Sequence, residues 1–479
     1  MKKPFFYIAV FFTLALCLPP GLEAARDTLS GGKKKLWDVK IGKRKVPDPS
    51  SKALAHYAMG IIYDNEGRHP EAVREYKAAL TLDPKISYLH TRIGIDYFLG
   101  KRIGPAIEEF KAARSLDPSD TKPRFLLALV YTVDNKFDLA QKEYEGIVRI
   151  NPNDIAALGS LADLLVIQEK MGEAAAIYEK LAEKEKRSSL LYFNLGVVYS
   201  RLGKLDKAID SLNKALEIEP DYMEPLIGLG VLYEMKKDLP RAITSFEKAL
   251  KIDPVNSKVY YSLGRLYYSV KKIDEAARQY ELLIKLDPKD PEPYIQWAGM
   301  YIRDKRPKDA VNILNRGLSE DIKSEDLYLA LGFAYGEDSK AGEAIKFYNQ
   351  ALSLAPDDAR VHFHLAAQYD KMKEREVAEK ELKEAIMLDP KFSDAYNYLG
   401  YMYAEESVNL DEAVTLIRKA LDIEPDNGAY IDSLGWAYFQ KGMNDEALVE
   451  LEKAEKKEPN DPEIKGHLKK VRERLKNRK

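Results

Sequence analysis

The chain has 479 residues, of which 45% are hydrophobic and 32% are charged, and its formal net charge is −2. A single cysteine excludes a framework of intrachain disulfides. The near balance of charge excludes a uniformly basic chain of the kind that binds nucleic acid nonspecifically.

Residues 1–24 have the pattern of a secretory signal peptide. Lys2 and Lys3 give it a positive start, residues 5–18 form an apolar run, and Ala24 offers a small residue for cleavage. The apolar run is too short for a comfortable membrane span. We therefore expect an exported protein that resides in the periplasm or at the outer membrane.

The single cysteine, Cys17, raises the alternative of a lipid anchor. Its surroundings resemble a bacterial lipobox, but bulky Leu16 stands directly before the cysteine, where that pattern has a small residue. Cleavage after Ala24 is therefore the favoured prediction, and a lipid anchor at Cys17 is the second. Cleavage after Ala24 leaves a mature chain without cysteine, which has no thiol chemistry.

Residues 25–52 form a basic linker, with nine Lys or Arg against three Asp and a net charge of +6. We interpret this linker as a flexible, solvated tether. Two alternatives stay open. In the first, the lysine runs of the linker bind an anionic surface such as a membrane. In the second, the apolar pair Leu36 and Trp37 docks on the repeat that follows the linker.

From residue 53 onward the sequence repeats with a period of 34. In residues 189–222, apolar residues at helical spacing precede Gly203, and a second apolar stripe runs on until Pro220. Each copy therefore predicts two amphipathic helices joined by a tight turn, a hairpin that buries its apolar face only by stacking on its neighbours. Twelve copies fill residues 53–461, with one extra residue near 407–409. They begin at Ala53, Ser87, Thr121, Ile155, Ser189, Met223, Ser257, Pro291, Glu325, Ala359, Ser393 and Gly428.

Two places of the repeat carry the same kind of residue along the chain. The eighth place is Gly or Ala in every copy, from Gly60 to Gly435, as a close crossing of two helices requires. The eleventh place is Tyr in eleven copies, from Tyr63 to Tyr438, which we interpret as core packing. This pattern closely resembles the tetratricopeptide repeat. The resemblance implies an all-α fold, a right-handed superhelical solenoid of about twelve helical hairpins.

Residues 462–479 carry Ile464, Leu468, Val471 and Leu475 on one helical stripe. The segment also has eight Lys or Arg against two Glu. The end of a solenoid needs a polar-backed element over its last apolar face. We therefore predict a basic amphipathic capping helix here, with a basic partner site as a second use of the same helix.

Signatures of catalysis and of metal binding are missing from the sequence. His56, His90 and His362 share the fourth place of the repeat, which predicts partly buried structural residues. His362 and His364 are two residues apart and so point away from each other on a helix. We predict no enzyme, no cofactor and no metal. Because residues 53–461 have a net charge of −15, we also predict no nucleic-acid partner.

The family resemblance also implies a concave groove lined by the first helix of each hairpin, with the fifth, ninth and twelfth places facing it. There the sequence has apolar and aromatic residues, of which we assign about half to packing between helices, and these favour hydrophobic anchors on a peptide or helix. The family's carboxylate clamp of Lys, Asn and Arg is absent. The predicted partner-binding residues are Tyr57, Phe125, Phe193, Val197, Ile227, Tyr261, Arg265, Ile295, Phe333, Phe363, Tyr401 and Trp436.

These features together predict a non-catalytic scaffold in the bacterial cell envelope, which binds segments of other proteins in an apolar groove. The alternative is a surface-attached adaptor whose basic ends bind anionic lipid or glycan, a peripheral form of membrane association.

Overall fold

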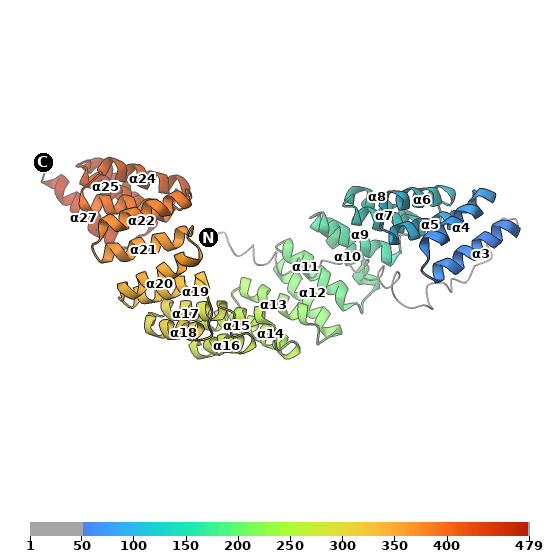
Figure 1. Ribbon diagram of the computed structural model, residues 1–479, viewed down its shortest axis with the longest axis horizontal. Coiled ribbons are helices and arrows are strands. Elements are labelled where there is room, and N and C mark those ends of the chain that lie inside the picture. The colour runs from blue at the N-terminus through green and yellow to red at the C-terminus, as the bar shows by residue number, and fades with distance from the viewer. Residues whose placement is uncertain (1–50, 478–479) are drawn as a thin grey trace. The chain divides into compact units, whose positions relative to one another are not determined.

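The computed structural model describes residues 51–477, which form 25 α-helices and no strand. The chain divides into two compact units between Pro254 and Val255. Figure 1 labels the helices of both units. The predicted signal peptide, and nearly all of the predicted basic linker, lie outside the described residues. Among the helices of residues 51–477, none is long and apolar enough to cross a membrane.

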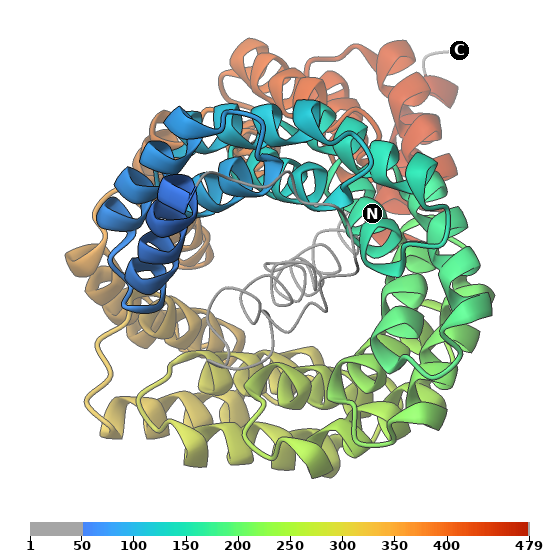
Figure 2. The same ribbon diagram turned by 90° about the vertical axis from the view of Figure 1, so that its right-hand side faces the viewer.

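The first unit consists of six helical hairpins. Its helices are α3 (Ser51–Asn65), α4 (His69–Leu82), α5 (Ser87–Leu99), α6 (Ile103–Leu116), α7 (Thr121–Val133), α8 (Phe137–Ile150), α9 (Ile155–Ile167), α10 (Met171–Lys184), α11 (Ser189–Arg201), α12 (Leu205–Ile218), α13 (Met223–Met235) and α14 (Leu239–Ile252). Each odd-numbered helix pairs with the next even-numbered one, and α4 packs on α5, α6 on α7, and so on along the unit. Figure 2 shows the hairpins of the unit stacked in chain order.

The second unit has six further hairpins and one terminal helix. Its helices are α15 (Ser257–Ser269), α16 (Ile273–Leu286), α17 (Glu292–Arg303), α18 (Pro307–Ser319), α19 (Glu325–Glu337), α20 (Ala341–Leu354), α21 (Ala359–Lys371), α22 (Arg375–Leu388), α23 (Ser393–Glu406), α24 (Leu410–Ile423), α25 (Gly428–Gln440), α26 (Asn444–Lys457) and α27 (Pro462–Lys476). The predicted all-α helical-repeat solenoid is confirmed in both units.

The turn between the two helices of a hairpin is set by one residue with positive φ. In the hairpin of α11 and α12 this residue is Gly203, with φ of 71°, and at the same place in the next hairpin it is Lys237, with φ of 60°. The predicted extra residue lies in the turn after α23, where Ser407 and Asn409 both have positive φ. The insertion is therefore accommodated in a turn, and the helices around it keep their register.

The eighth place of the repeat lies where the two helices of a hairpin cross most closely. A Cβ atom added at Gly94 would lie 2.5 Å from the ring of Phe110, and one at Gly332 would lie 2.4 Å from Tyr348. Both distances are shorter than van der Waals contact, so a larger residue would force the helices apart. The interpretation of the small residues as a helix crossing is confirmed.

The eleventh-place tyrosines pack their rings between helices, and several of their hydroxyls reach polar partners. Tyr403 is only 2% exposed, and Tyr438 is 7% exposed. Arg418 donates a hydrogen bond to the Tyr438 hydroxyl at 2.6 Å. Arginine side chains also cover several of these rings, as Arg68 covers Tyr63 at 4.4 Å from the ring centre. The core-packing interpretation of these tyrosines is confirmed.

The last helix, α27, covers the apolar face of α26. Ile464, Leu468 and Val471 are buried in the same cluster as Leu451 and Ala454 of α26. Asp461 caps the helix by accepting hydrogen bonds from the amides of its first turn. The helix closes the C-terminal end of the array, as its apolar stripe predicts.

Candidate partner-binding face

The structure places the twelve predicted partner-binding residues on the first helices and separates them by exposure. Three of them are buried: Phe193 at 4%, Val197 at 3% and Trp436 at 5% exposure. Seven are partly buried, and Arg265 and Phe333 are exposed. For these nine residues partner binding stays a prediction. The three buried residues offer a partner no surface in this conformation.

The burial of Trp436 has a plain physical cause in the capping helix. His467 of α27 stacks on the indole with ring centres 4.1 Å apart, and the ammonium of Lys470 lies 4.6 Å from the ring centre. His467 is held in place by Asp432, whose carboxylate lies 2.9 Å from its Nδ1. Burial raises the pKa of Asp432. The capping helix therefore accounts for the burial of Trp436.

Phe193 is buried by the hairpin that follows it. Its ring lies 5.4 Å from that of Tyr222, the residue before α13. The related side chains Phe125 and Tyr261 contact Tyr144 and Tyr280 of their own hairpins at 5.6 Å and 6.5 Å. These three aromatic residues of the fifth place therefore each contact another ring within the array, and local neighbours decide how much of the ring stays accessible.

A continuous aromatic cluster lies on the first helices of the second unit. We define it as Phe333 of α19, His364 and Phe363 of α21, Phe392 before α23, and Tyr398 of α23. Phe333 meets His364 edge-on at 5.6 Å, and His364 lies 5.4 Å from Phe363. Phe363 in turn contacts Phe392 at 5.1 Å and Tyr398 at 5.8 Å. Phe333 is 39% exposed, and the other four residues are partly buried.

The aromatic cluster is uncharged at neutral pH. Burial lowers the pKa of His364 below its ordinary value of 6.5, with a smaller contribution from the charge of Arg360. The hydroxyl of Tyr398 donates to Asp370 at 3.0 Å, and burial raises its pKa. The cluster can therefore make apolar and stacking contacts.

The clefts found on the described chain lie away from this face. One lies between α10, α11 and α12 and is lined by charged residues such as Glu183, Lys207 and Lys214. Another lies between α26 and α27 and includes Lys465, Lys469 and other charged residues. Neither is lined by a predicted partner-binding residue. The candidate face is thus separate from these two clefts.

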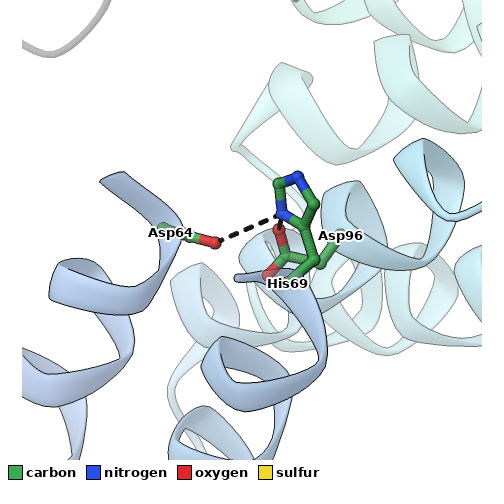
Figure 3. Close-up of side chains that lie close together, drawn as sticks. All are labelled: Asp64, His69 and Asp96. Carbon is green, nitrogen blue, oxygen red and sulfur yellow. Dashed lines mark hydrogen bonds and ion pairs between the residues drawn. The ribbon is translucent and has the colours of Figure 1, made fainter. Parts of the chain in front are cut away.

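A buried polar cluster joins the first two hairpins (Figure 3). The Nδ1 atom of His69 lies 2.9 Å from Asp96 and 3.9 Å from Asp64. Tyr76 donates to Asp64 at 2.6 Å, and Arg92 forms an ion pair with Asp64. Burial, reinforced by the neighbouring Asp64, raises the pKa of Asp96 to about 8. A cation could be held by the donor atoms of Asp64, His69 and Asp96. The guanidinium of Arg92 already supplies positive charge at this place. We therefore interpret the cluster as a structural ion-pair network.

Sequence reasoning missed this network because its members lie in three helices. One signal was available. The tenth place carries a polar residue at Asp96 and at Gln368, whereas it is apolar in the other copies. A buried place that carries a carboxylate requires a hydrogen-bonding or charged partner nearby.

The histidines of the fourth place are partly buried, as predicted, and each is paired with a glutamate. His56, His90 and His362 contact Glu75, Glu109 and Glu381 at 2.6–2.7 Å. Each pair joins the first helix of a hairpin to the second. These histidines are structural contacts that recur with the repeat.

The fold defines the class of this protein as an all-α helical-repeat solenoid. Family models described as tetratricopeptide repeat match residues 53–86, 125–189, 189–222 and 220–467. The last of these covers more than half of the chain. The chain therefore belongs to the tetratricopeptide repeat family.

Individual relatives are similar over limited stretches or at low identity. A TPR repeat-containing protein of Pseudomonas aeruginosa is 36% identical over 83 residues, which are 17% of this chain and 14% of that protein. Yeast Tom70 is 18% identical with a TM-score of 0.42, covering 82% of this chain and 96% of that one. The structure of Naa15/Naa10 bound to HypK-THB is 16% identical with a TM-score of 0.44, and the match covers 89% of this chain and 66% of that one. The family assignment rests on the sequence matches.

Proposed function

We propose that this protein is a non-catalytic scaffold that binds segments of other proteins on the first helices of its hairpins. The aromatic cluster around Phe333 and Phe363 carries this proposal. It combines an exposed ring with four partly buried ones on three successive first helices, so that one partner side chain could contact several rings at once. Aromatic groups in such surroundings contribute disproportionately to binding between proteins.

Further accessible residues of the same places lie on first helices in each of the two units. Ile227 and Ile295 are partly buried, and Tyr261 has its hydroxyl 3.4 Å from Asp290. Burial and the charge of Asp290 raise the pKa of Tyr261, so its hydroxyl stays protonated. Apart from the charged side chain of Arg265, a partner segment would therefore meet neutral, largely apolar side chains. We infer that hydrophobic anchors recognise this face and that ion pairs have a secondary role.

Site-specific photocrosslinking tests this proposal. A photoreactive phenylalanine analogue at Phe333 should give a discrete crosslinked product with a partner protein. The matched control is the same analogue at Leu354 of α20, which is 49% exposed but lies on a second helix. Crosslinks from position 354 alone, or from neither position, would contradict the assignment of the partner to the first helices.

We further propose that the scaffold is exported and acts in the bacterial cell envelope. The support is the sequence of residues 1–24 alone, with its lysine start and apolar run. Intact-mass measurement of the protein from its native cells should show cleavage after Ala24. A mass increased by lipid and starting at Cys17 would instead show the anchored form, and a chain that retains Met1 in the cytoplasm would refute export.

The second candidate function is an adaptor that binds anionic lipid or glycan through its basic ends. One observation favours it: the basic side chains of α27 are all exposed, from Lys465 to Lys476. Sedimentation with vesicles of anionic lipid should then retain the protein at low salt and release it at high salt. Absence of binding at low salt would exclude this function for lipid.

A further inference from the structure

The first helix of the array, α3, has an apolar face that no described helix covers. Its residues at the seventh and tenth places are Met59, which is 39% exposed, and Ile62, which is 47% exposed. In all eleven later copies, the residues at these two places are buried. Ile93 and Val130, for example, are both 0% exposed. The difference therefore results from the position of α3 in the array.

Within the first unit, each first helix is covered by the segment that directly precedes it in the sequence. Helix α5 packs on α4, α7 on α6, and α9 on α8, so each first helix lies on the second helix that directly precedes it in sequence. At the other end of the array, α27 covers α26. By the same order, the chain that would cover α3 is the chain that ends at residue 50.

That preceding chain has the composition and the length for this contact. Residues 36–46 contain Leu36 and Trp37 and three further aliphatic residues among lysines. Helix α3 has 15 residues and is therefore about 22 Å long. The 14 residues from Trp37 to the start of α3 span up to about 46–50 Å when extended. Trp37 can therefore reach Met59 and Ile62.

We propose that residues 36–46 dock on this face of α3, with Leu36 and Trp37 packed against Met59 and Ile62. The segment then closes the N-terminal end of the array as α27 closes the other end. An open solenoid end with an apolar face requires such a cap.

Hydrogen exchange of the α3 amides in the full chain tests this docking. Trp37→Ser and Ile62→Ser should each accelerate exchange about tenfold or more, because each removes one side of the same buried contact. The double variant should exchange no faster than either single variant. Serine and isoleucine have similar helix propensities, so Ile62→Ser changes little else. The matched control is Leu82→Ser, at a 48% exposed residue of α4, which should leave exchange in α3 unchanged.

Three results would overturn the proposal. Unchanged exchange in Ile62→Ser would show that the face is not covered. Additive effects of the two substitutions would show that Trp37 acts elsewhere. A concentration-dependent dimer in sedimentation equilibrium that Ile62→Ser dissociates, and Trp37→Ser does not, would assign the face to a second copy of the chain.

Discussion

Single residues determine both the turns of this array and its buried polar contacts. The positive-φ residue of each hairpin turn is a lysine in several copies, although lysine is strained in this backbone region. The polar contacts join neighbouring helices through charged groups that are shielded from solvent, as at Asp163 and Asp432. Both features lead to predictions for individual side chains.

Replacing Lys237 with glycine should stabilise the protein. Lys237 has φ of 60° and is exposed, so the substitution relieves backbone strain without removing a packed side chain. The gain is about 0.5–1 kcal/mol, because the strain relieved exceeds the added entropy of the unfolded chain. Urea unfolding measures the change. The control is Lys236→Gly, where φ is −79° and the same substitution should destabilise.

Asp163 should make the stability depend on pH between about 4 and 6. Burial raises the pKa of Asp163 from 3.8 to about 6, while the hydroxyl of Tyr178 donates a hydrogen bond to it. In this pH range the folded state binds more protons than the unfolded state, so stability falls as the pH rises. Asp163→Asn should remove this slope and stabilise the protein at pH 7 by about 3 kcal/mol at most. The test is to measure the free energy of unfolding across this pH range for both proteins. If its dependence on pH is the same in Asp163→Asn, Asp163 is not the group responsible.

At the scale of single elements, each helix depends on the neighbour that covers it. The capping helix α27 shows this most directly, because its buried side chains contact α26. Leu468 is 1% exposed, so Leu468→Ala should destabilise the protein by about 2–5 kcal/mol. Val449→Ala on α26, at a residue that is 52% exposed, should change stability by less than about 0.5 kcal/mol. Equal effects in thermal unfolding would show that α27 is not a structural cap.

The 34-residue register predicted the helices and turns well, because apolar spacing, turn residues and small residues recur at the same places in each copy. It located the turn at Gly203 and the extra residue near 407–409, and it identified the small residues at helix crossings. It did not predict that Trp436 and Phe193 are buried while other residues at the fifth and ninth places are accessible. Their burial depends on α27 in one case and on Tyr222 in the other, and neither contact follows from the register.

Across the whole molecule, the same hairpin recurs in both units, and within each unit it produces a row of similar surfaces that differ in their side chains. In a repeat protein, stability comes mainly from contacts between neighbouring repeats, so residues on the exposed part of the first helices are available for recognition. The aromatic cluster of the second unit is the part of this row with the most rings in mutual contact. A partner that uses it should therefore depend on Phe333 more than on equally exposed apolar residues elsewhere.

The affinity of a crosslinked partner for two matched variants tests this account most directly. Phe333→Ala should weaken binding about tenfold or more, since burying such a side chain contributes about 1.5–3 kcal/mol. Leu354→Ala should change affinity by about twofold or less, and higher salt should have a smaller effect than Phe333→Ala. Circular dichroism should show that both variants keep their helices. Unchanged affinity in Phe333→Ala, together with binding that is lost at higher salt, would contradict the account and assign the contact to charged surfaces.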